Sequence, residues 1–418
     1  MNGLLGRLIV SALSKDDGED WKKESALMSS IYSFSMLNIA ATHGKNGLAG
    51  CFSQRDPSDI ARTVTKPPDG LPGHIYEFME KTEEVWQTCV ESAPLYKRGW
   101  VFQERMLAPR TIYFCKTQLI WGCHEERKFE GINGYIRERD NVAKIHWDVM
   151  VERYSRCQLS HDEDKFVAIS GLARVKQRFL QTPYIAGLWE NELPRNLLWK
   201  TNIGPDNLAP SYPSQYRPPS WSWAAINGVS LTNPLDSSKV HPGLPKKSAA
   251  RKMGNIENIV EVTNIYINNV NDPFGKIASG SITLNSGLTP LHLALEPSLS
   301  IIEGKEQKYK TVAQDVNLVG ESYFDVRHRG DMEYFGMSII GLWKRTSSNK
   351  NHVFVEVLLL LKVAGYRGTF RRLGTFTAFA PSDRSVREGH RVLREDDYLQ
   401  IRETPHRRGY QQYVVRVI

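Results

Sequence analysis

The sequence changes character near residue 225, and this change constrains the fold more than any other feature. Nine of the ten tryptophans precede that position, and apolar residues there recur at helical spacing. After a charged stretch at 239–252, apolar and polar residues alternate in short runs separated by turn residues. Runs of this kind are typical of antiparallel strands, so we expect two parts of different structural class.

The part before residue 225 predicts helices joined by turn-rich segments. Leu27, Ile31, Phe34 and Leu37 are spaced for one face of a first helix. Further helices are expected at about 75–90, 99–106, 140–156 and 164–179, with a strand at 111–114. Five prolines within 204–220 predict a linker or a rigid wall between layers.

The part after residue 225 predicts a β-rich domain. Strands are expected at 259–267, 281–284, 335–343, 353–363, 369–379 and 412–417. The chain is therefore expected to be of the α+β class, with a partial α/β, mainly helical domain followed by a mainly antiparallel β sandwich or barrel. The expected domains are 1–130, a helical extension with a Pro/Trp-rich linker at 131–225, and the β-rich domain at 226–418.

Composition and cysteine spacing exclude several classes of protein. The 418 residues are 41% hydrophobic and 24% charged, which excludes collagen-like, coiled-coil and wholly disordered chains. No apolar run approaches the roughly 20 residues of a membrane helix. The five cysteines are odd in number and widely spaced, so we expect reduced thiols in the cytoplasm rather than a disulfide framework.

The positive charge is unevenly distributed. The net charge is +8, and residues 362–418 hold 12 Lys and Arg against 6 Asp and Glu. A basic segment can bind nucleic acid or another anionic surface. The arginines near 369–376 are spaced among strand-forming residues, however, and no binding motif accompanies them. A strand with one solvated cationic face is therefore the favoured interpretation.

Motifs for nucleotide binding, nucleophilic catalysis and metal binding are absent. The chain has no G-x-x-x-x-G-K-S/T phosphate loop, no G-x-G-x-x-G and no G-x-S-x-G. Cys115, Cys123 and His124 lack a second ligand pair at zinc spacing, so buried thiols explain them better than a metal site. We therefore expect no metal and no bound cofactor.

Two stretches carry a more specific signal. Residues 16–42 run from Asp16 through Trp21 to Thr42, and residues 98–114 read Arg-Gly-Trp-Val-Phe-Gln-Glu-Arg-Met-Leu-Ala-Pro-Arg-Thr-Ile-Tyr-Phe. Both resemble the fungal heterokaryon incompatibility (HET) domain, and the second is similar to its R-G/A-W-x-x-Q-E-R-x-L-x-x-R-x-L/I-x-F block almost position by position. Shorter similarities follow at 164–173, 186–189 and 219–224. The motif residues that we single out are Trp21, Trp100, Gln103, Glu104, Arg105 and Arg110.

The start of the chain departs from this family. Members usually show a Y-x-A-L-S-Y-C/V-W-G block and then a W-I/V-D-x-L-C-I-x-Q block. Here the first block is missing, and the second survives only at 8–15, where Ser11 and Ser14 stand in place of aspartate and cysteine. The resemblance therefore implies a HET domain with a truncated N-terminal part and weakened activity.

Two interpretations of the 98–114 block stay open. In the first, Trp100 and a Glu–Arg pair lock a helix-to-strand corner, and Glu104 and Arg105, adjacent on a helix, point in different directions. In the second, the block is a partner-binding face. Trp221 and Trp223 present a similar choice between core and ligand cage, and alternate positions of an extended strand would let both fill one core.

The resemblance implies an intracellular protein that signals non-self recognition and programmed cell death through protein partners or self-association. It also implies an alternative, because HET domains are distantly similar to TIR domains, some of which cleave NAD with a helix glutamate. Glu24 is the matching residue, and NAD would then be a substrate. Glu24 also fits a first-turn carboxylate that stabilises the helix dipole. A second alternative is binding of an anionic surface or nucleic acid by the basic C-terminal segment.

Overall fold

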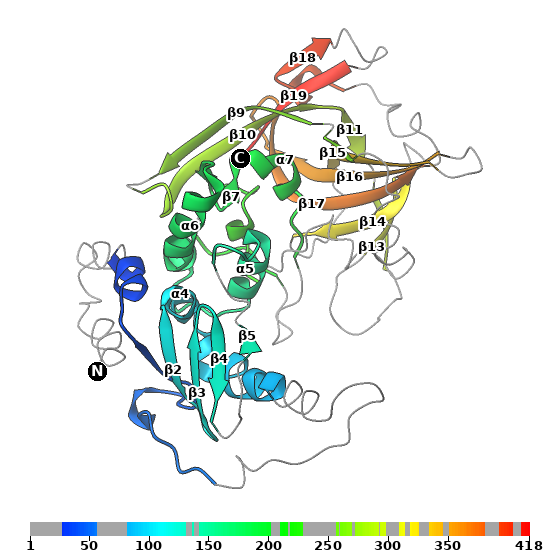
Figure 1. The fold of residues 1–418 in the computed structure, drawn as a ribbon. Coiled ribbons are helices and arrows are strands. Elements are labelled where there is room, and N and C mark those ends of the chain that lie inside the picture. Colours follow the sequence, from blue (N-terminus) through cyan, green and yellow to red (C-terminus); the bar gives the residue numbers. More distant parts are fainter. Residues whose placement is uncertain are drawn as a thin grey trace, which may run out of the picture. The chain divides into compact units, whose positions relative to one another are not determined.

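The computed structural model describes residues 27–56, 82–130, 136–137, 142–201, 210–215, 218–228, 256–258, 260–269, 272–291, 293–297, 309–313, 318–325, 334–345, 351–380, 393–403 and 411–418. The chain divides into two compact units, Met1–Gln181 and Thr182–Ile418, and each is described by itself. Figure 1 shows the elements of both units. The threefold division with bounds at 130 and 225 stays a prediction.

The first unit contains a five-stranded sheet whose strands lie in sequence order (Figure 1). Its strands are β1 (Asn38–Ala41), β2 (Arg110–Phe114), β3 (Leu119–Cys123), β4 (Glu126–Phe129) and β5 (Ile136–Arg137). β1 pairs with β2 in parallel, and each later pair is antiparallel. The parallel pair therefore needs a long crossover connection, whereas short turns join β2, β3 and β4.

Helices of the first unit largely follow the sequence expectations. Residues 27–33 and 82–86 are helical, and the other elements are η1 (Gly47–Ala49), η3 (Gln87–Glu91), η4 (Pro94–Lys97), α4 (Gly99–Leu107), α5 (Trp147–Ser155), η5 (Asp162–Lys165) and α6 (Val167–Leu180). α4 ends at an extended Ala108, because a residue before proline disfavours helical backbone. α6 ends at Gln181, which is left-handed with φ of 51°. The helices expected at 99–106 and 164–179 and the strand at 111–114 are confirmed, whereas the one expected at 140–156 begins only at Trp147.

The buried face of the helix at 27–33 differs from the expected one. Met28 and Tyr32 are buried, whereas Leu27 and Phe34 are exposed. The predicted face, which included Leu27 and Phe34, is therefore wrong. Apolar residues at helical spacing occur on both faces, so tertiary packing decides which face is buried. The helix also ends at residue 33, before the last positions of the predicted face.

One face of the first sheet carries the core of this unit. Tyr113, Ile120 and Phe129 point to that face from three adjacent strands, because side chains alternate along each strand. Trp86 packs edge-to-face on Tyr113, with ring centroids 5.3 Å apart. The same cluster includes Val90, Ala93, Tyr96 and Val101 from the helical segments before and within α4. Helices and sheet therefore share one core.

The second unit is built on a twelve-stranded sheet. Its strands are β8 (Ile256–Asn258), β9 (Glu261–Asn269), β10 (Ile277–Ser286), β11 (Leu288–Leu291), β12 (Leu293–Pro297), β13 (Tyr309–Ala313), β14 (Leu318–Phe324), β15 (Tyr334–Arg345), β16 (Asn351–Lys362), β17 (Thr369–Ala380), β18 (Gln400–Glu403) and β19 (Gln411–Val417). The smaller elements are β6 (Tyr184–Ile185), β7 (Leu188–Trp189), η6 (Glu190–Glu192), α7 (Leu193–Asn196), η7 (Trp223–Ala225) and η10 (Glu395–Asp397). Every strand expected after residue 225 is confirmed.

The pairing of this sheet is almost wholly antiparallel. Among the described strands only β17 and β19 pair in parallel. β12 pairs only with β13 and β8 only with β15, so the described part of the sheet keeps open edges and forms no closed barrel. The barrel expectation is therefore wrong for these residues, and the sandwich stays a prediction. The mixture of helices and sheets expected of the whole chain is confirmed.

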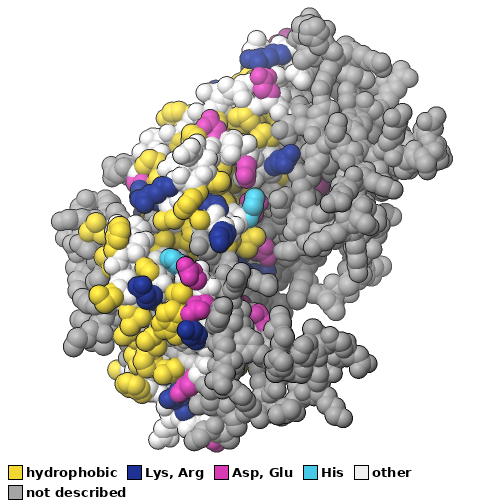
Figure 2. Space-filling view, viewed as in Figure 1, with side chains coloured by type: hydrophobic (Ala, Val, Ile, Leu, Met, Phe, Trp, Pro, Cys, Tyr) yellow, Lys and Arg dark blue, Asp and Glu magenta, His cyan; other side chains and the backbone are white. Residues whose placement is uncertain are grey.

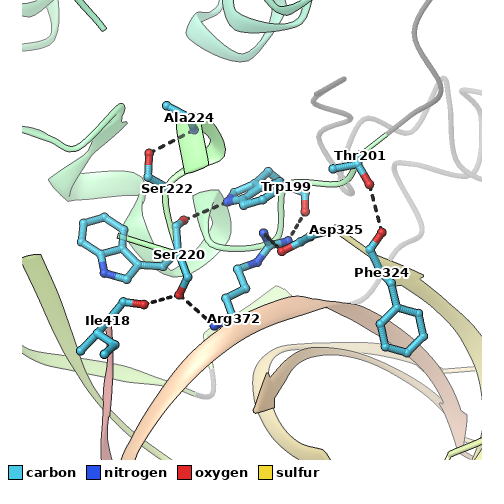
Figure 3. A network of polar contacts seen from close by, with 10 residues as sticks. Trp199, Thr201, Ser220, Ser222, Ala224, Phe324, Asp325, Arg372 and Ile418 are labelled. Atoms are coloured by element: carbon cyan, nitrogen blue, oxygen red, sulfur yellow. Dashed lines mark hydrogen bonds and ion pairs between the residues drawn. The ribbon is translucent and has the colours of Figure 1, made fainter. Parts of the chain in front are cut away.

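A buried charge pair lies within the polar network of the second unit (Figure 3). Arg372 on β17 is 1% exposed, and its Nη1 donates to Asp325 Oδ2 at 3.0 Å. Its guanidinium carbon lies 3.3 Å from the ring centroid of Trp199, whose carbonyl accepts a bond from Nη2. The main-chain N–H of Arg372 donates to Ser220 Oγ at 2.9 Å, and that hydroxyl donates to the carbonyl of Ile418. Contacts from segments far apart in the sequence therefore hold the Arg372–Asp325 pair in place.

Among residues 369–377 of the basic strand β17, Arg371 is the only exposed one. Thr369 and Leu373, which alternate with Arg371 along the strand, are buried, and Arg372 points into the core, so these residues form no solvated cationic face. The expectation of a solvated face is therefore wrong for Arg372, because adjacent strand residues point to opposite faces. Burial raises the pKa of Asp325 to about 7 and lowers the pKa of Arg372 to about 10, and each partner's charge opposes the other's shift.

Trp221 and Trp223 fill the core, as the sequence pattern predicts. Both are 0% exposed. The backbone is not the expected extended strand, because a turn leads directly into η7. Ser222 fixes this geometry, since its Oγ accepts from the N–H of Ala224 at 3.2 Å and donates to the carbonyl of Ala186 at 2.7 Å. The tryptophans are thus held by a capped turn.

We expect Asp325→Ala to lower the free energy of unfolding by about 3–5 kcal/mol, because it leaves the buried guanidinium of Arg372 without its carboxylate. Urea denaturation followed by circular dichroism measures this loss. The double variant Asp325→Leu/Arg372→Met should lose less, since it removes both charges. Arg371→Met is the matched control and should change stability by less than about 0.5 kcal/mol. A double variant less stable than Asp325→Ala would contradict this account.

Candidate functional site

The corner formed by α4 and β2 contains most of the motif residues. Arg98 is extended before α4, and Pro109 separates α4 from β2. The N–H of Gly99 donates to the carbonyl of Gln158 at 2.8 Å. A Cβ built on Gly99 would lie 2.5 Å from Leu159 Cδ2, so the start of α4 packs closely on the chain that follows α5.

Gln103 lies where three helices meet. It is 1% exposed, and its Oε1 accepts a hydrogen bond from the N–H of Gly171 in α6 at 2.8 Å. A Cβ on Gly171 would lie 2.5 Å from Ser29 Cβ in the helix at 27–33 and 2.7 Å from Gln103 Oε1. The glycine therefore lets both neighbours approach, and Gln103 joins α4 to α6 through a buried polar contact.

Trp100 joins α4 to the segment before α6. Its indole N–H donates to Asp164 Oδ2 at 3.2 Å. Asp164 belongs to η5 and is buried, whereas the Trp100 residue is only half-buried. This geometry supports the corner interpretation for Trp100, with part of the ring left at the surface.

Glu104 faces Tyr32 and Arg98 rather than its neighbour Arg105. The Tyr32 hydroxyl donates to the Glu104 carboxylate, and the charge of Arg98 also stabilises the ionised form, so both lower the pKa. Burial outweighs them and raises the pKa of Glu104 to about 7. The corner therefore holds a carboxyl group that titrates near neutral pH, and its arginine neighbour is Arg98.

Arg105 and Arg110 point in different directions. The guanidinium carbon of Arg105 lies 5.3 Å from the ring centroid of Tyr96 and 5.9 Å from that of Trp86. Arg110 is the exposed first residue of β2 and pairs with Cys123 of β3. The motif residues that come together around α4 are Trp100, Gln103, Glu104 and Arg105. Arg110 lies apart from them on the sheet.

A small pocket with a cavity volume of about 20 Å³, partly open to solvent, lies where the end of α4 meets the sheet. We call it the α4–sheet pocket, and the residues that matter for its chemistry are Trp86, Arg105, Thr111, Tyr113, Gly122 and Arg127. The guanidinium carbon of Arg127 lies 3.5 Å from the ring centroid of Trp86. Two guanidinium groups therefore flank one indole ring.

Sequence reasoning did not single out Trp86 or Arg127. A signal for Arg127 is present, because it lies two residues before Phe129 and shares the sheet face of that core residue. No local pattern links Trp86 to the strands, since their contact joins segments far apart in the sequence. The pocket is thus a product of tertiary packing.

Two thiols meet beside this core. Cys89 and Cys115 are hydrogen-bonded to each other, and Cys89 Sγ lies 3.4 Å from Thr117 Oγ1. The bond from Cys115 lowers the pKa of Cys89 to about 6, although partial burial acts in the opposite direction. The same bond and burial raise the pKa of Cys115. The proton therefore stays on Cys115, and all five cysteines are free thiols.

The second face of the first sheet is only partly covered. Ile112, Phe114 and Trp121 alternate with the core residues of β2 and β3 and stay partly exposed. Phe52 is 84% exposed and packs edge-to-face on Phe114, with centroids 5.5 Å apart. Figure 2 shows hydrophobic side chains gathered over this sheet. We call Phe52, Arg110, Ile112, Phe114 and Trp121 the open face.

Metal-binding and membrane-spanning features are not found in the described ranges. No group of three or more His, Cys, Asp or Glu within them could hold a metal ion. No described helix is both long enough and apolar enough to cross a bilayer. Trp21 and Glu24 lie outside those ranges, so their roles stay predictions.

Stability should depend on pH through Glu104. Its pKa of about 7 in the folded protein exceeds the ordinary value of 4.5, so folding favours the protonated form. This stabilisation is complete below about pH 4.5 and is lost as the pH rises through 7. Glu104→Gln, which mimics the protonated form, should reduce the change in melting temperature across this interval, and the contribution of Asp325 should remain. A variant with the unchanged pH profile would contradict the assignment.

Cys89 should react with iodoacetamide faster than the other thiols at pH 7, because a thiol with a pKa of about 6 is mostly thiolate. Cys157 is the slow reference, since burial raises its pKa to about 12. Timed alkylation followed by peptide mass spectrometry measures both rates. Cys115→Ala removes the donor and should slow Cys89. Equal rates at Cys89 and Cys157 would show that the thiol pair does not activate Cys89.

Comparison with known proteins gives one match. A family model described as heterokaryon incompatibility protein (HET) matches residues 12–104. No curated protein and no solved structure matches the chain. Within the described residues, the match takes in the helix at 27–33, β1 and α4 up to Glu104. The resemblance found in the sequence is therefore confirmed, and residues 12–104 carry a match to the heterokaryon incompatibility domain.

Proposed function

We propose that this protein is a signalling and interaction module of non-self recognition and programmed cell death. It acts in the cytoplasm through contacts with other proteins or with further copies of itself. The heterokaryon incompatibility match supports this biological setting. The open face is the observation that carries the proposal of a protein contact.

The open face has the properties of an interaction surface. Sheets that are mostly antiparallel commonly have one face packed on the core and one solvated face, which carries polar residues. In this unit one face holds the core, whereas Ile112, Phe114 and Trp121 on the other stay partly exposed, beside the largely exposed ring of Phe52. Burial of such apolar area against a partner is favourable by about 25 cal/mol per Å². A contiguous apolar patch of this kind marks interaction sites on soluble proteins.

The motif block contributes to both the corner and the surface. Gln103 and Trp100 make contacts that support the corner interpretation. Arg110 lies on the open face, opposite Cys123 and diagonal to Trp121 in the strand register. Arginines next to aromatic residues are typical of the positions that dominate interface energies. We therefore assign Arg110 to the partner-binding face and the helix residues to the scaffold that holds it.

Two alternatives remain beside this proposal. Cleavage of NAD depends on Glu24, and an NAD-consumption assay that compares the unchanged chain with Glu24→Gln distinguishes it from an interaction role. Binding of an anionic surface depends on solvated basic residues near the C-terminus. Arg372 is buried, and Lys362 Nζ donates to Asp397 Oδ1 at 2.7 Å, so these two charges are used within the fold.

Expression of the full chain in a filamentous fungal host tests the proposal. We expect a partial loss of viability, and recovery with Phe52→Ser/Phe114→Thr, which removes apolar area from the open face and keeps a strand-forming residue at 114. Colony counts after induction measure viability. Analytical ultracentrifugation of the purified chain shows whether the contact is with a second copy.

Tyr366→Ser is the matched control, because Tyr366 is 66% exposed but belongs to the second unit. Circular dichroism melts establish that the double variant is folded. A folded double variant as harmful as the unchanged protein would overturn the open face as the contact surface. An unchanged protein without any effect on viability would overturn the proposed role.

A further inference from the structure

We propose that Cys89 and Cys115 form a peroxide-sensitive modification site, at which hydrogen peroxide oxidises the two thiols to an intramolecular disulfide. Disulfides that form in reducing compartments are usually transient and redox-sensing, so such a bond is compatible with the free thiols of the structure. The inference concerns these two thiols alone. It is therefore independent of the open face and of the proposed role in non-self recognition.

The fold brings the two sulfurs together from segments that lie apart in the sequence. Cys89 belongs to η3, and Cys115 directly follows β2, where the chain turns toward β3. Cys89 packs against the core cluster that contains Cys115, and the two side chains are hydrogen-bonded to each other. Cys89 Sγ also lies 3.4 Å from the hydroxyl oxygen of Thr117 in the same turn. Two contacts therefore hold the Cys89 sulfur at this turn.

Cys89 has the properties of the thiol that attacks peroxide. It is partly exposed, whereas Cys115 is only 2% exposed. Hydrogen bonds from Cys115 and Thr117 stabilise the Cys89 thiolate and outweigh partial burial, so its pKa falls to about 6. Redox-sensing cysteines combine a low pKa with access to solvent and a second cysteine nearby. In addition, η3 is a π-helical turn, a rare geometry that is frequent at functional sites.

Cys115 has the properties of the second thiol. Its hydrogen bond to Cys89 is the largest cause of its raised pKa, and burial is the next. Oxidation of Cys89 to a neutral sulfenic acid removes the negative charge at that sulfur, so burial becomes the main cause that still opposes ionisation of Cys115. A hydrogen bond from Thr42 favours the Cys115 thiolate. The first oxidation step therefore prepares Cys115 for the second.

The chemistry needs hydrogen peroxide as its only co-reactant. The Cys89 thiolate attacks one peroxide oxygen, the O–O bond breaks, and the hydroxide that leaves takes a proton from solvent and becomes water. The sulfur is thereby oxidised to sulfenic acid, and the peroxide is reduced. Cys115 Sγ then attacks Cys89 Sγ, so that an S–S bond forms and the S–O bond breaks. The hydroxyl group leaves with the proton of Cys115 as a second water.

Peroxide treatment of the reduced full chain tests the inference. After the reductant has been removed, hydrogen peroxide is added, and the remaining thiols are then blocked with iodoacetamide. Peptide mass spectrometry without reductant should find two peptides joined through Cys89 and Cys115, which dithiothreitol separates. The other three cysteines, Cys51, Cys123 and Cys157, should be found alkylated.

Two substitutions separate the two steps. Cys115→Ser keeps a hydrogen-bond donor beside Cys89 but removes the second sulfur, so sulfenic acid should persist at Cys89 and be labelled by dimedone. Thr117→Val removes a hydroxyl group that stabilises the thiolate, so oxidation of Cys89 at pH 6 should slow by about threefold.

Cys123→Ser is the matched control, because Cys123 is also a partly exposed free thiol. This variant should form the linked peptide as fast as the unchanged protein. Circular dichroism melts establish that each variant is folded. If Cys115→Ser does not fold, Cys89→Ser replaces it, and Cys115 should then stay unoxidised because its partner in the reaction is missing.

Several outcomes would overturn the inference. One is the absence of the linked peptide in the unchanged protein, whether Cys89 is left as a thiol or as a sulfenic acid. Another is linkage of Cys89 to a different cysteine. A third is oxidation of Cys123 as fast as that of Cys89, which would show that the thiol pair does not direct the reaction.

Discussion

The alternation of side chains along β2 is the constraint on which the first unit depends. Thr111 and Tyr113 point to the face where the helical segments pack, whereas Arg110, Ile112 and Phe114 point to the other. β2 also joins the parallel strand β1 to the antiparallel strand β3. A shift of one residue in its register would exchange core, pocket and open face together. The core and the proposed interaction surface are therefore the two sides of a single strand.

Both units stack an arginine on a tryptophan ring. Arg372 lies over Trp199 and Arg127 over Trp86, with guanidinium carbons 3.3 Å and 3.5 Å from the ring centroids. A guanidinium group is planar and weakly hydrated, so its face packs on a ring while its edge keeps hydrogen bonds. In the second unit that edge meets the carboxylate of Asp325. In the first unit Arg127 of β4 lies over the ring of Trp86, so the stack joins the sheet to a segment far away in the sequence.

Local sequence patterns predicted the helices and strands well. They predicted poorly which side chains of those elements are buried. Strands such as β16 and β17, and α4 before Pro109, follow from apolar runs and a proline stop. The face of the helix at 27–33 did not follow, because its burial depends on the close approach of α6 at Gly171. Strand alternation indicates that one of two adjacent arginines in β17 is buried, but which one depends on a distant carboxylate. The motif pointed to Arg105, whereas its partner Arg127 in the pocket comes from a strand without a motif.

The place of β19 in the sheet bears on how the second unit is made. β19 pairs with β10, and the N–H of Ser220 donates to the carbonyl of Ile418, 198 positions later in the sequence. Contacts of such separation form late, because the entropy of closing a long loop is lost before they contribute. During translation, β10 therefore leaves the ribosome well before β19 has been synthesised. In that interval the nascent strand presents an unpaired edge, which suits it to capture by chaperones or to pairing with another unfinished chain.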